Sequence, residues 1–171
     1  MVLTLLLTVV GPVLTPSALV AQPAERLVSR YTRLVQCREY KQSPKDQDWA
    51  SQRCAGLGRN AVWVTCIDSA TCHYGFGPRP HVSGPFGTGR TVAPVEWLGH
   101  SLRGKFVPLA VIIRLPGADR DGRGRLGLVV FRLRRDGTSC VVGEASGNVD
   151  ARRVAARSMI RFLCLAEPQT S

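Results

Sequence analysis

The sequence has few acidic residues, few aromatic residues and almost no lysine, and each shortage narrows the choice of partners. Asp and Glu number 12 against 23 Arg and Lys, which gives a net charge of +11 and favours polyanionic partners. Only three of those cations are lysines, and the arginine guanidinium is a forked donor that suits phosphate and carboxylate groups. Aromatic residues make up 6% of the chain, and Trp49, Trp63 and Trp97 are more typical of core or loop anchors than of a sugar-stacking platform.

The chain also lacks the short motifs that identify many enzymes and cofactor proteins. It contains no Gly-x-Ser-x-Gly motif, and the glycines of residues 84–90 are not followed by the Lys-Ser/Thr pair of a phosphate-binding loop. Five residues separate Cys66 from Cys72, where haem attachment requires two, and the short paired spacings of a zinc site are absent. Residues 119–122 resemble the start of a calcium loop, but no bidentate glutamate follows. We therefore predict no catalytic residue, no cofactor and no bound metal.

Charge is absent from residues 1–20, which are mostly apolar, and small residues follow at Ser17, Ala18 and Ala21. This pattern predicts a signal peptide over residues 1–21, cleaved after Ala21, and therefore a periplasmic or secreted protein. A retained membrane anchor is the alternative. Pro12 and Pro16 interrupt the apolar stretch, however, and it is shorter than the roughly 20 residues that a spanning helix needs.

Six cysteines follow the predicted cleavage site. An even count in an exported chain predicts three disulfide bonds, whereas the same count in the cytosol would favour metal or redox chemistry. The sequence does not choose among the connectivities that six cysteines allow, although local patterns favour certain pairs. The candidate pairs are Cys37 with Cys54 around a polar loop, Cys66 with Cys72 across a hairpin, and Cys140 with Cys164.

Alternating and β-branched segments predict strands. Residues 61–65 and 71–76 flank a turn whose loop at 68–70 would place Ile67 opposite Thr71. Residues 106–115 form the most hydrophobic segment after the leader, and Pro108 confines its start to a sheet edge or a bulge.

The dipeptide Asp136-Gly137 is the strongest short hairpin signal in the chain. Used as a two-residue turn after residues 126–133, it places Leu133 opposite Cys140 and Phe131 opposite Val142. These strands and residues 106–115 then form an antiparallel meander.

Other segments predict connections. We expect loops at residues 39–51, 77–94 and 116–125, a short strand at 95–98, and either a first strand or an irregular arm at 25–35.

A C-terminal helix follows the last predicted strand. Asn148 is the expected N-cap and Asp150 lies in the first turn, where a carboxylate suits the helix dipole. Apolar residues recur at helical spacing as far as Leu163, and Pro168 marks the end. Residues 22–171 are therefore predicted to form one α+β domain, with a mostly antiparallel sheet of about five to seven strands and the helix packed on one face.

Arginines of the helix and of the preceding hairpin are the expected contacts for an anionic partner. A charged helix face is most often merely solvated, but the excess of positive charge favours polyanion contact. The partner would be an anionic envelope polymer, a membrane surface or an acidic protein, and the sequence indicates no oligomeric state. The candidate residues are Arg132, Arg134, Arg135, Arg152, Arg153, Arg157 and Arg161.

We therefore predict a non-enzymatic envelope protein, and two alternatives stay open. A secreted hydrolase acting on a phosphate-bearing substrate would use Glu96, His100 and Arg114, provided that the fold brings them together. A structural or partner-stabilising envelope subunit would show no affinity for polyanions.

Several segments together resemble a family of small, uncharacterised exported proteins of alphaproteobacteria. They are Cys54-Ala55-Gly56-Leu57-Gly58, residues 62–77 ending in Tyr-Gly-Phe-Gly, Val95-Glu96-Trp97, and Thr138-Ser139-Cys140-Val141-Val142 before an arginine-rich helix. The resemblance covers most of the chain after the leader, with Cys66 and Cys72 as additions to the family pattern. It implies export and this architecture, and it supplies no activity.

Overall fold

The computed structural model describes residues 27–35, 37–42, 49–67, 71–88, 93–118, 124–160 and 164. The predicted signal peptide therefore lies outside the described residues. The elements are β1 (Val28–Thr32), β2 (Arg38–Gln42), β3 (Trp49–Ala55), β4 (Ala61–Ile67), β5 (Thr71–Gly77), β6 (Ser83–Thr88), β7 (Val95–Leu102), β8 (Lys105–Ala118), β9 (Gly124–Leu133), β10 (Ser139–Ala145) and α1 (Asn148–Ile160).

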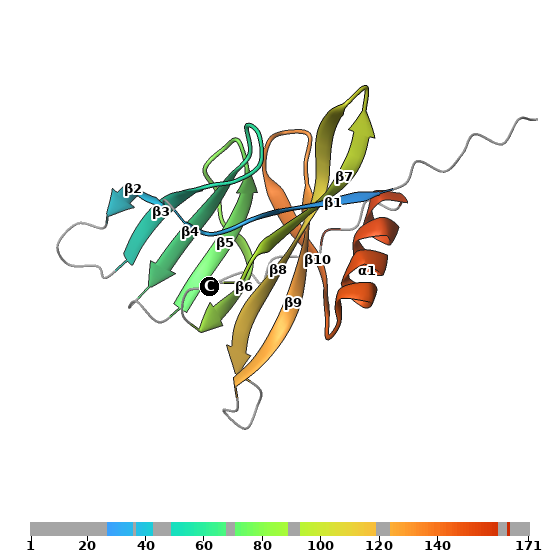
Figure 1. Ribbon diagram of the computed structural model, residues 1–171. Coiled ribbons are helices and arrows are strands. Elements are labelled where there is room, and N and C mark those ends of the chain that lie inside the picture. Colours follow the sequence, from blue (N-terminus) through green and yellow to red (C-terminus); the bar gives the residue numbers. More distant parts are fainter. Residues whose placement is uncertain are drawn as a thin grey trace, which may run out of the picture.

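The strands form two antiparallel sheets of five strands each. The first sheet has the order β1-β7-β8-β9-β10 and the second has the order β2-β3-β4-β5-β6. Figure 1 shows the two sheets beside each other, with α1 against the first. This arrangement confirms the predicted fold class, an antiparallel β structure with a C-terminal helix, although the strands divide over two sheets instead of one. No helix in the described part of the chain is long and apolar enough to cross a membrane.

The main core lies between the sheets. Phe76 of the second sheet makes edge-to-face contacts with Trp97 and Phe131 of the first, with ring centroids 6.0 and 4.8 Å apart. All three side chains are fully buried. Since successive strand residues face opposite sides, Trp97 points between the sheets while Glu96 and Leu98 point towards α1. The first sheet is thus covered on both faces over much of its area.

A second, smaller core joins α1 to the first sheet. Ala151 and Ala155 are fully buried and pack with Leu98, Ile112 and Val130, because small side chains let the helix approach the sheet closely. The first helical hydrogen bond runs from Ala151 N–H to the carbonyl of residue 147 at 3.0 Å. Gly147 is therefore the N-cap, and the predicted cap, Asn148, is the first helical residue.

All three candidate disulfides are present. They are Cys37–Cys54, Cys66–Cys72 and Cys140–Cys164. The predicted hairpin register is confirmed as well, with Cys66 opposite Cys72 and Ile67 opposite Thr71. Three disulfides are typical of a protein that folds in an oxidising compartment outside the cytoplasm.

Two predicted loops contain strands. The polar segment 39–51 includes most of β2 and the start of β3, which pair with each other, and residues 43–48 between them lie outside the description. The Gly/Pro-rich segment 77–94 contains β6, which pairs with β5. In both cases strand pairing and the neighbouring core override a weak local propensity.

The predicted short strand at 95–98 extends to residue 102 as β7. Pro108 lies beside a shift in the β7–β8 register, which confirms the expected bulge.

The register of the β9–β10 hairpin differs by one residue from the prediction. Leu133 lies opposite Ser139, and Phe131 lies opposite Val141. The turn is longer than two residues because Gly137 N–H donates to the Arg134 carbonyl at 3.1 Å, while Arg134 N–H donates to the Thr138 carbonyl at 2.8 Å. Gly137 has a φ of 86°, so the loop is a three-residue turn that ends in a left-handed glycine.

Candidate functional site

A groove of about 670 Å³ lies where three turns meet. The turns are β3–β4, β7–β8 and β9–β10, which lie together at the upper edge of Figure 1. The lining comes from the first and third turns and from the start of β8 beside the second, and Arg30 of β1 and Pro78 after β5 complete it. The groove is lined by five exposed cations, and no carboxylate is among its described lining residues. We call it the basic groove; its cations are Arg30, Arg59, Lys105, Arg134 and Arg135.

The β9–β10 turn holds two of the five cations. Asp136 Oδ1 accepts hydrogen bonds from Thr138 N–H at 2.9 Å and from the Thr138 hydroxyl at 2.6 Å. These bonds, followed by the charges of Arg134 and Arg79, lower the pKa of Asp136 below its ordinary value of 3.8. A depressed pKa means that the charged carboxylate supports the turn at neutral pH, and that this support is lost only as the pH falls through the lowered value.

The turn is also tied to the second sheet. Arg79 N–H donates to the Gly137 carbonyl at 3.3 Å. A Cβ atom on Gly77 would lie 2.3 Å from the same carbonyl oxygen, so a larger residue at that position would push the two backbones apart. The positions of Arg134 and Arg135 therefore depend on contacts between the sheets as well as on the turn itself.

The other cations are held by local geometry. The guanidinium of Arg30 lies 5.1 Å from the ring centroid of Phe106, a cation–π contact on the wall of the groove. Arg59 lies in a tight turn in which Asn60 N–H and its side-chain amide both donate to the Leu57 carbonyl, at 3.1 and 3.2 Å. Between the cations the lining is largely apolar, from Leu57, Phe106, Val107, Pro108, Leu109 and Leu133.

This arrangement suits the binding of an anion. No histidine, cysteine, serine, aspartate or glutamate is among the described residues that line the groove, and Lys105 is the lining residue whose side chain could act as a base or nucleophile. Five positive charges around one hollow attract an anion electrostatically, and arginine holds phosphate or carboxylate through paired hydrogen bonds.

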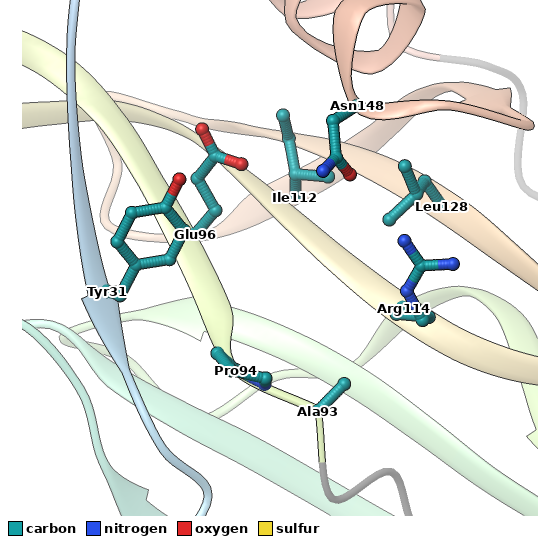
Figure 2. A pocket seen from close by; sticks show the side chains of 8 residues that line it. All are labelled: Tyr31, Ala93, Pro94, Glu96, Ile112, Arg114, Leu128 and Asn148. Carbon is teal, nitrogen blue, oxygen red and sulfur yellow. The ribbon is translucent and has the colours of Figure 1, made fainter.

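A second cavity, of about 190 Å³, lies on the face of the first sheet that carries α1. We call it the Glu96 pocket; Figure 2 shows its lining, which consists of Tyr31, Ala93, Pro94, Glu96, Ile112, Arg114, Leu128 and Asn148. The Glu96 side chain is 7% exposed. Its Oε1 atom accepts hydrogen bonds from the Ser29 hydroxyl and from Arg152 Nε, each at 2.7 Å. This bond to Glu96 is the main cause of a raised pKa for Arg152.

The structure separates the arginines that were predicted to contact an anionic partner. Only Arg134 and Arg135 line the basic groove. Arg132 donates to the Ser158 carbonyl, Arg152 pairs with Glu96, and Arg153 pairs with Asp150 at 2.7 Å. Arg157 is exposed on α1, and Arg161 lies outside the described residues. Anion binding by any of them stays a prediction.

The residues proposed for a hydrolase come together only in part. Glu96 and Arg114 both line the Glu96 pocket, whereas His100, four residues further along β7, is not one of its lining residues.

Sequence reasoning missed Arg30, Arg59 and Lys105 as groove residues. They come from three separate elements, and no local pattern in the sequence links them.

A serine–histidine contact is another feature that the sequence did not reveal. His81 Nε2 accepts hydrogen bonds from Ser139 N–H at 2.6 Å and from the Ser139 hydroxyl at 2.8 Å. Ser139 is 3% exposed, and its hydroxyl oxygen also accepts from Phe76 N–H at 3.0 Å. A hydroxyl so enclosed does not reach a substrate, and the cluster instead ties β10 to the second sheet.

Metal and cofactor hypotheses gain no support from the described residues. Cys66 and Cys72 form a disulfide, so they offer no thiolates to zinc. No cluster of three or more histidine, cysteine or acidic side chains suited to a metal occurs in the described part of the chain. Residues 119–122, with the weak likeness to a calcium loop, lie outside the description.

In comparisons with known proteins, no family model, no curated protein and no solved structure matches this chain.

Proposed function

We propose that the protein is an exported, non-enzymatic protein that binds an anionic envelope polymer in the basic groove. The observation that carries the proposal is the gathering of five cations around a hollow of about 670 Å³ with no carboxylate among its described lining residues. Like charges repel one another, and Asp136 beside Arg134 offsets only part of this repulsion, so a bound anion would stabilise the cluster.

The shape of the site favours a polymer over the other two partners. A concave groove between three turns encloses a chain, whereas a flat bilayer would contact mainly the rim of the groove. An acidic protein would have to insert an acidic loop. The apolar lining around Phe106 and Leu133 would contact the uncharged backbone of a polymer between its anionic groups.

The export part of the proposal is supported by the three disulfides and by the uncharged apolar leader. Membership of the exported alphaproteobacterial family is proposed on the sequence resemblance alone.

The binding proposal is tested by titrating polyphosphate of defined length into the oxidised protein at several salt concentrations. If the five cations each neutralise one phosphate, the logarithm of the binding constant falls against the logarithm of salt concentration with a slope of about −3.5, as for single-stranded nucleic acid. A slope near zero, or no binding at low salt, would contradict the proposal and favour a structural subunit. Turnover of a phosphate ester that is lost in His100→Ala would favour the hydrolase.

A further inference from the structure

Two arginines of the second sheet lie directly opposite each other on neighbouring strands. Arg38 of β2 pairs with Arg53 of β3, and both side chains are exposed. Like charges at directly opposed positions destabilise a sheet, because their Cβ atoms are only about 4.5–5.5 Å apart. Within the described residues, neither arginine forms an ion pair with a carboxylate, and Glu39 lies in register with Gln52, on the other face of the sheet. A bound anion would therefore relieve the repulsion between the two arginines.

The arginine pair lies on the face of the second sheet that points away from the core. Arg53 precedes Cys54, which is fully buried between the sheets, and successive strand residues face opposite sides. The helix α1 packs against β8, β9 and β10 of the first sheet, so it does not cover this face (Figure 1). We call this surface the outer face, and it includes Arg38, Tyr40, Ser51, Arg53, Trp63 and Thr65.

An aromatic ring lies beside the arginine pair. Tyr40 is 46% exposed, and its ring meets the ring of Trp63 edge to face, with centroids 5.1 Å apart. The register between β2 and β3 shifts between Glu39 and residue 41, so Tyr40 lies at a β-bulge, a feature that re-aims side chains. The bulge thus leaves on the outer face an aromatic ring that is partly open to a ligand.

Trp63 supports both this ring and one of the arginines. It is 5% exposed, and its Nε1–H donates to the Gly77 carbonyl at 3.0 Å. The guanidinium of Arg53 lies 5.7 Å from the centroid of the Trp63 ring, a cation–π contact that offsets only part of the repulsion from Arg38. Trp63 is therefore an anchor, and the ring that a ligand can reach is that of Tyr40.

A pair of hydroxyl groups extends the polar surface. Ser51 lies opposite Thr65, and their hydroxyl oxygens are 2.7 Å apart. Ser51 is two residues from Arg53 along β3, so the hydroxyl pair and the arginine share the outer face. One hydroxyl donates to the other, and the pair retains one hydrogen and several lone pairs for the hydroxyl groups of a ligand.

We propose that the outer face binds an acidic sugar, such as a uronic acid residue of a glycan. The sugar carboxylate binds between Arg38 and Arg53, whose forked guanidinium groups suit it, and the sugar ring packs against Tyr40. A nucleotide also combines an anion with a ring, but the hydroxyl pair favours a ligand rich in hydroxyl groups. This site is separate from the basic groove and does not depend on the function proposed for that groove.

The test uses trigalacturonate, which is titrated into the full oxidised protein while amide signals are followed in NMR spectra. Maltotriose serves as an uncharged trisaccharide, and a thymidine trinucleotide serves as an anion of the other class. The proposal predicts that trigalacturonate binds more tightly than either and shifts the signals around Arg38, Arg53 and Thr65.

Arg38→Gln is expected to weaken the binding of trigalacturonate at least about tenfold, because a charge-assisted hydrogen bond is lost. Its melting temperature should stay the same or rise, since the substitution removes the repulsion from Arg53. Arg157→Gln makes the same change of charge at an exposed position on α1 and should leave the binding unchanged within about twofold.

The tyrosine provides an independent pair of variants. Tyr40→Phe keeps the ring and should bind trigalacturonate as the natural protein does, whereas Tyr40→Leu should weaken binding severalfold. Loss of binding in both, or in neither, would contradict packing of the sugar on this ring.

Three results would overturn the proposal. One is that trigalacturonate shifts no signals of the outer face at millimolar concentration, including the case in which it shifts only those of the basic groove, which would leave the groove proposal intact. Another is that maltotriose or the trinucleotide binds the outer face as tightly as trigalacturonate. The third is that Arg38→Gln either binds normally or loses binding only together with its melting temperature, as a purely structural role predicts.

Discussion

Replacing Arg134 and Arg135 together by glutamate is expected to weaken polyphosphate binding by at least about 100-fold. Each arginine contributes a charge-assisted hydrogen bond worth roughly 1.5–3 kcal/mol when well formed, and glutamate adds repulsion at the same place. Both side chains are exposed, so solvent screening keeps the loss near the lower end of this range. Binding constants from calorimetry at low salt, with circular dichroism to verify folding, check this prediction.

Two matched variants give this prediction its controls. Arg157→Glu changes an exposed arginine on α1, outside the groove, and should weaken binding by only a few fold through the overall charge. Asp136→Asn should strengthen binding severalfold. It removes a carboxylate 3.9 Å from Arg134 and retains an oxygen that accepts the Thr138 hydrogen bonds. Equal losses for the hairpin and helix variants would show that the anion does not select the basic groove.

Removing the Cys37–Cys54 disulfide is expected to destabilise the protein more than removing the shorter Cys66–Cys72 disulfide. The bridge spans 17 residues, so the chain-entropy model predicts a loss of about 3 kcal/mol in the free energy of unfolding for the double alanine variant. The Cys66–Cys72 bridge spans 6 residues, and its removal should cost about 2 kcal/mol. Each pair has one fully buried cysteine, Cys54 or Cys72, which makes the two variants comparable.

Urea unfolding of both double variants measures these losses. A separate measurement is non-reducing peptide mapping of the protein recovered from its own host. It should find all three disulfide bonds and an N-terminus near Gln22. Free thiols in that material, or a stability unchanged by loss of the longer bridge, would contradict the assignment to an oxidising compartment.

The fold was predictable where local chemistry left one arrangement. Two β-prone runs flank the short turn at residues 68–70, and a three-residue loop there predicts both the register and the Cys66–Cys72 disulfide that the structure contains. The β9–β10 hairpin was harder, because Asp136-Gly137 fits both a two-residue and a three-residue turn. The hydrogen bonds from Thr138 to Asp136 and the left-handed Gly137 accompany the longer turn, which moves the register by one residue.

The second sheet and the basic groove were not predictable in the same way. β2 and β6 are polar or rich in glycine and proline, and they form strands because β3 and β5 offer them free edges. Arg30, Arg59 and Lys105 line the same groove as Arg134 and Arg135 only because distant segments of the chain pack together. Composition indicates that positive charge must gather on the surface, but it does not indicate where.

Mapping the polyphosphate site residue by residue tests the central claim most directly. Amide signals of the oxidised, isotope-labelled protein would be followed in NMR spectra during a polyphosphate titration. The groove predicts that the largest shifts fall on the three turns around Arg59, Lys105 and Arg135, with small shifts along α1. Shifts concentrated on α1 around Arg153 and Arg157, or spread evenly over the surface, would contradict the assignment of anion binding to the basic groove.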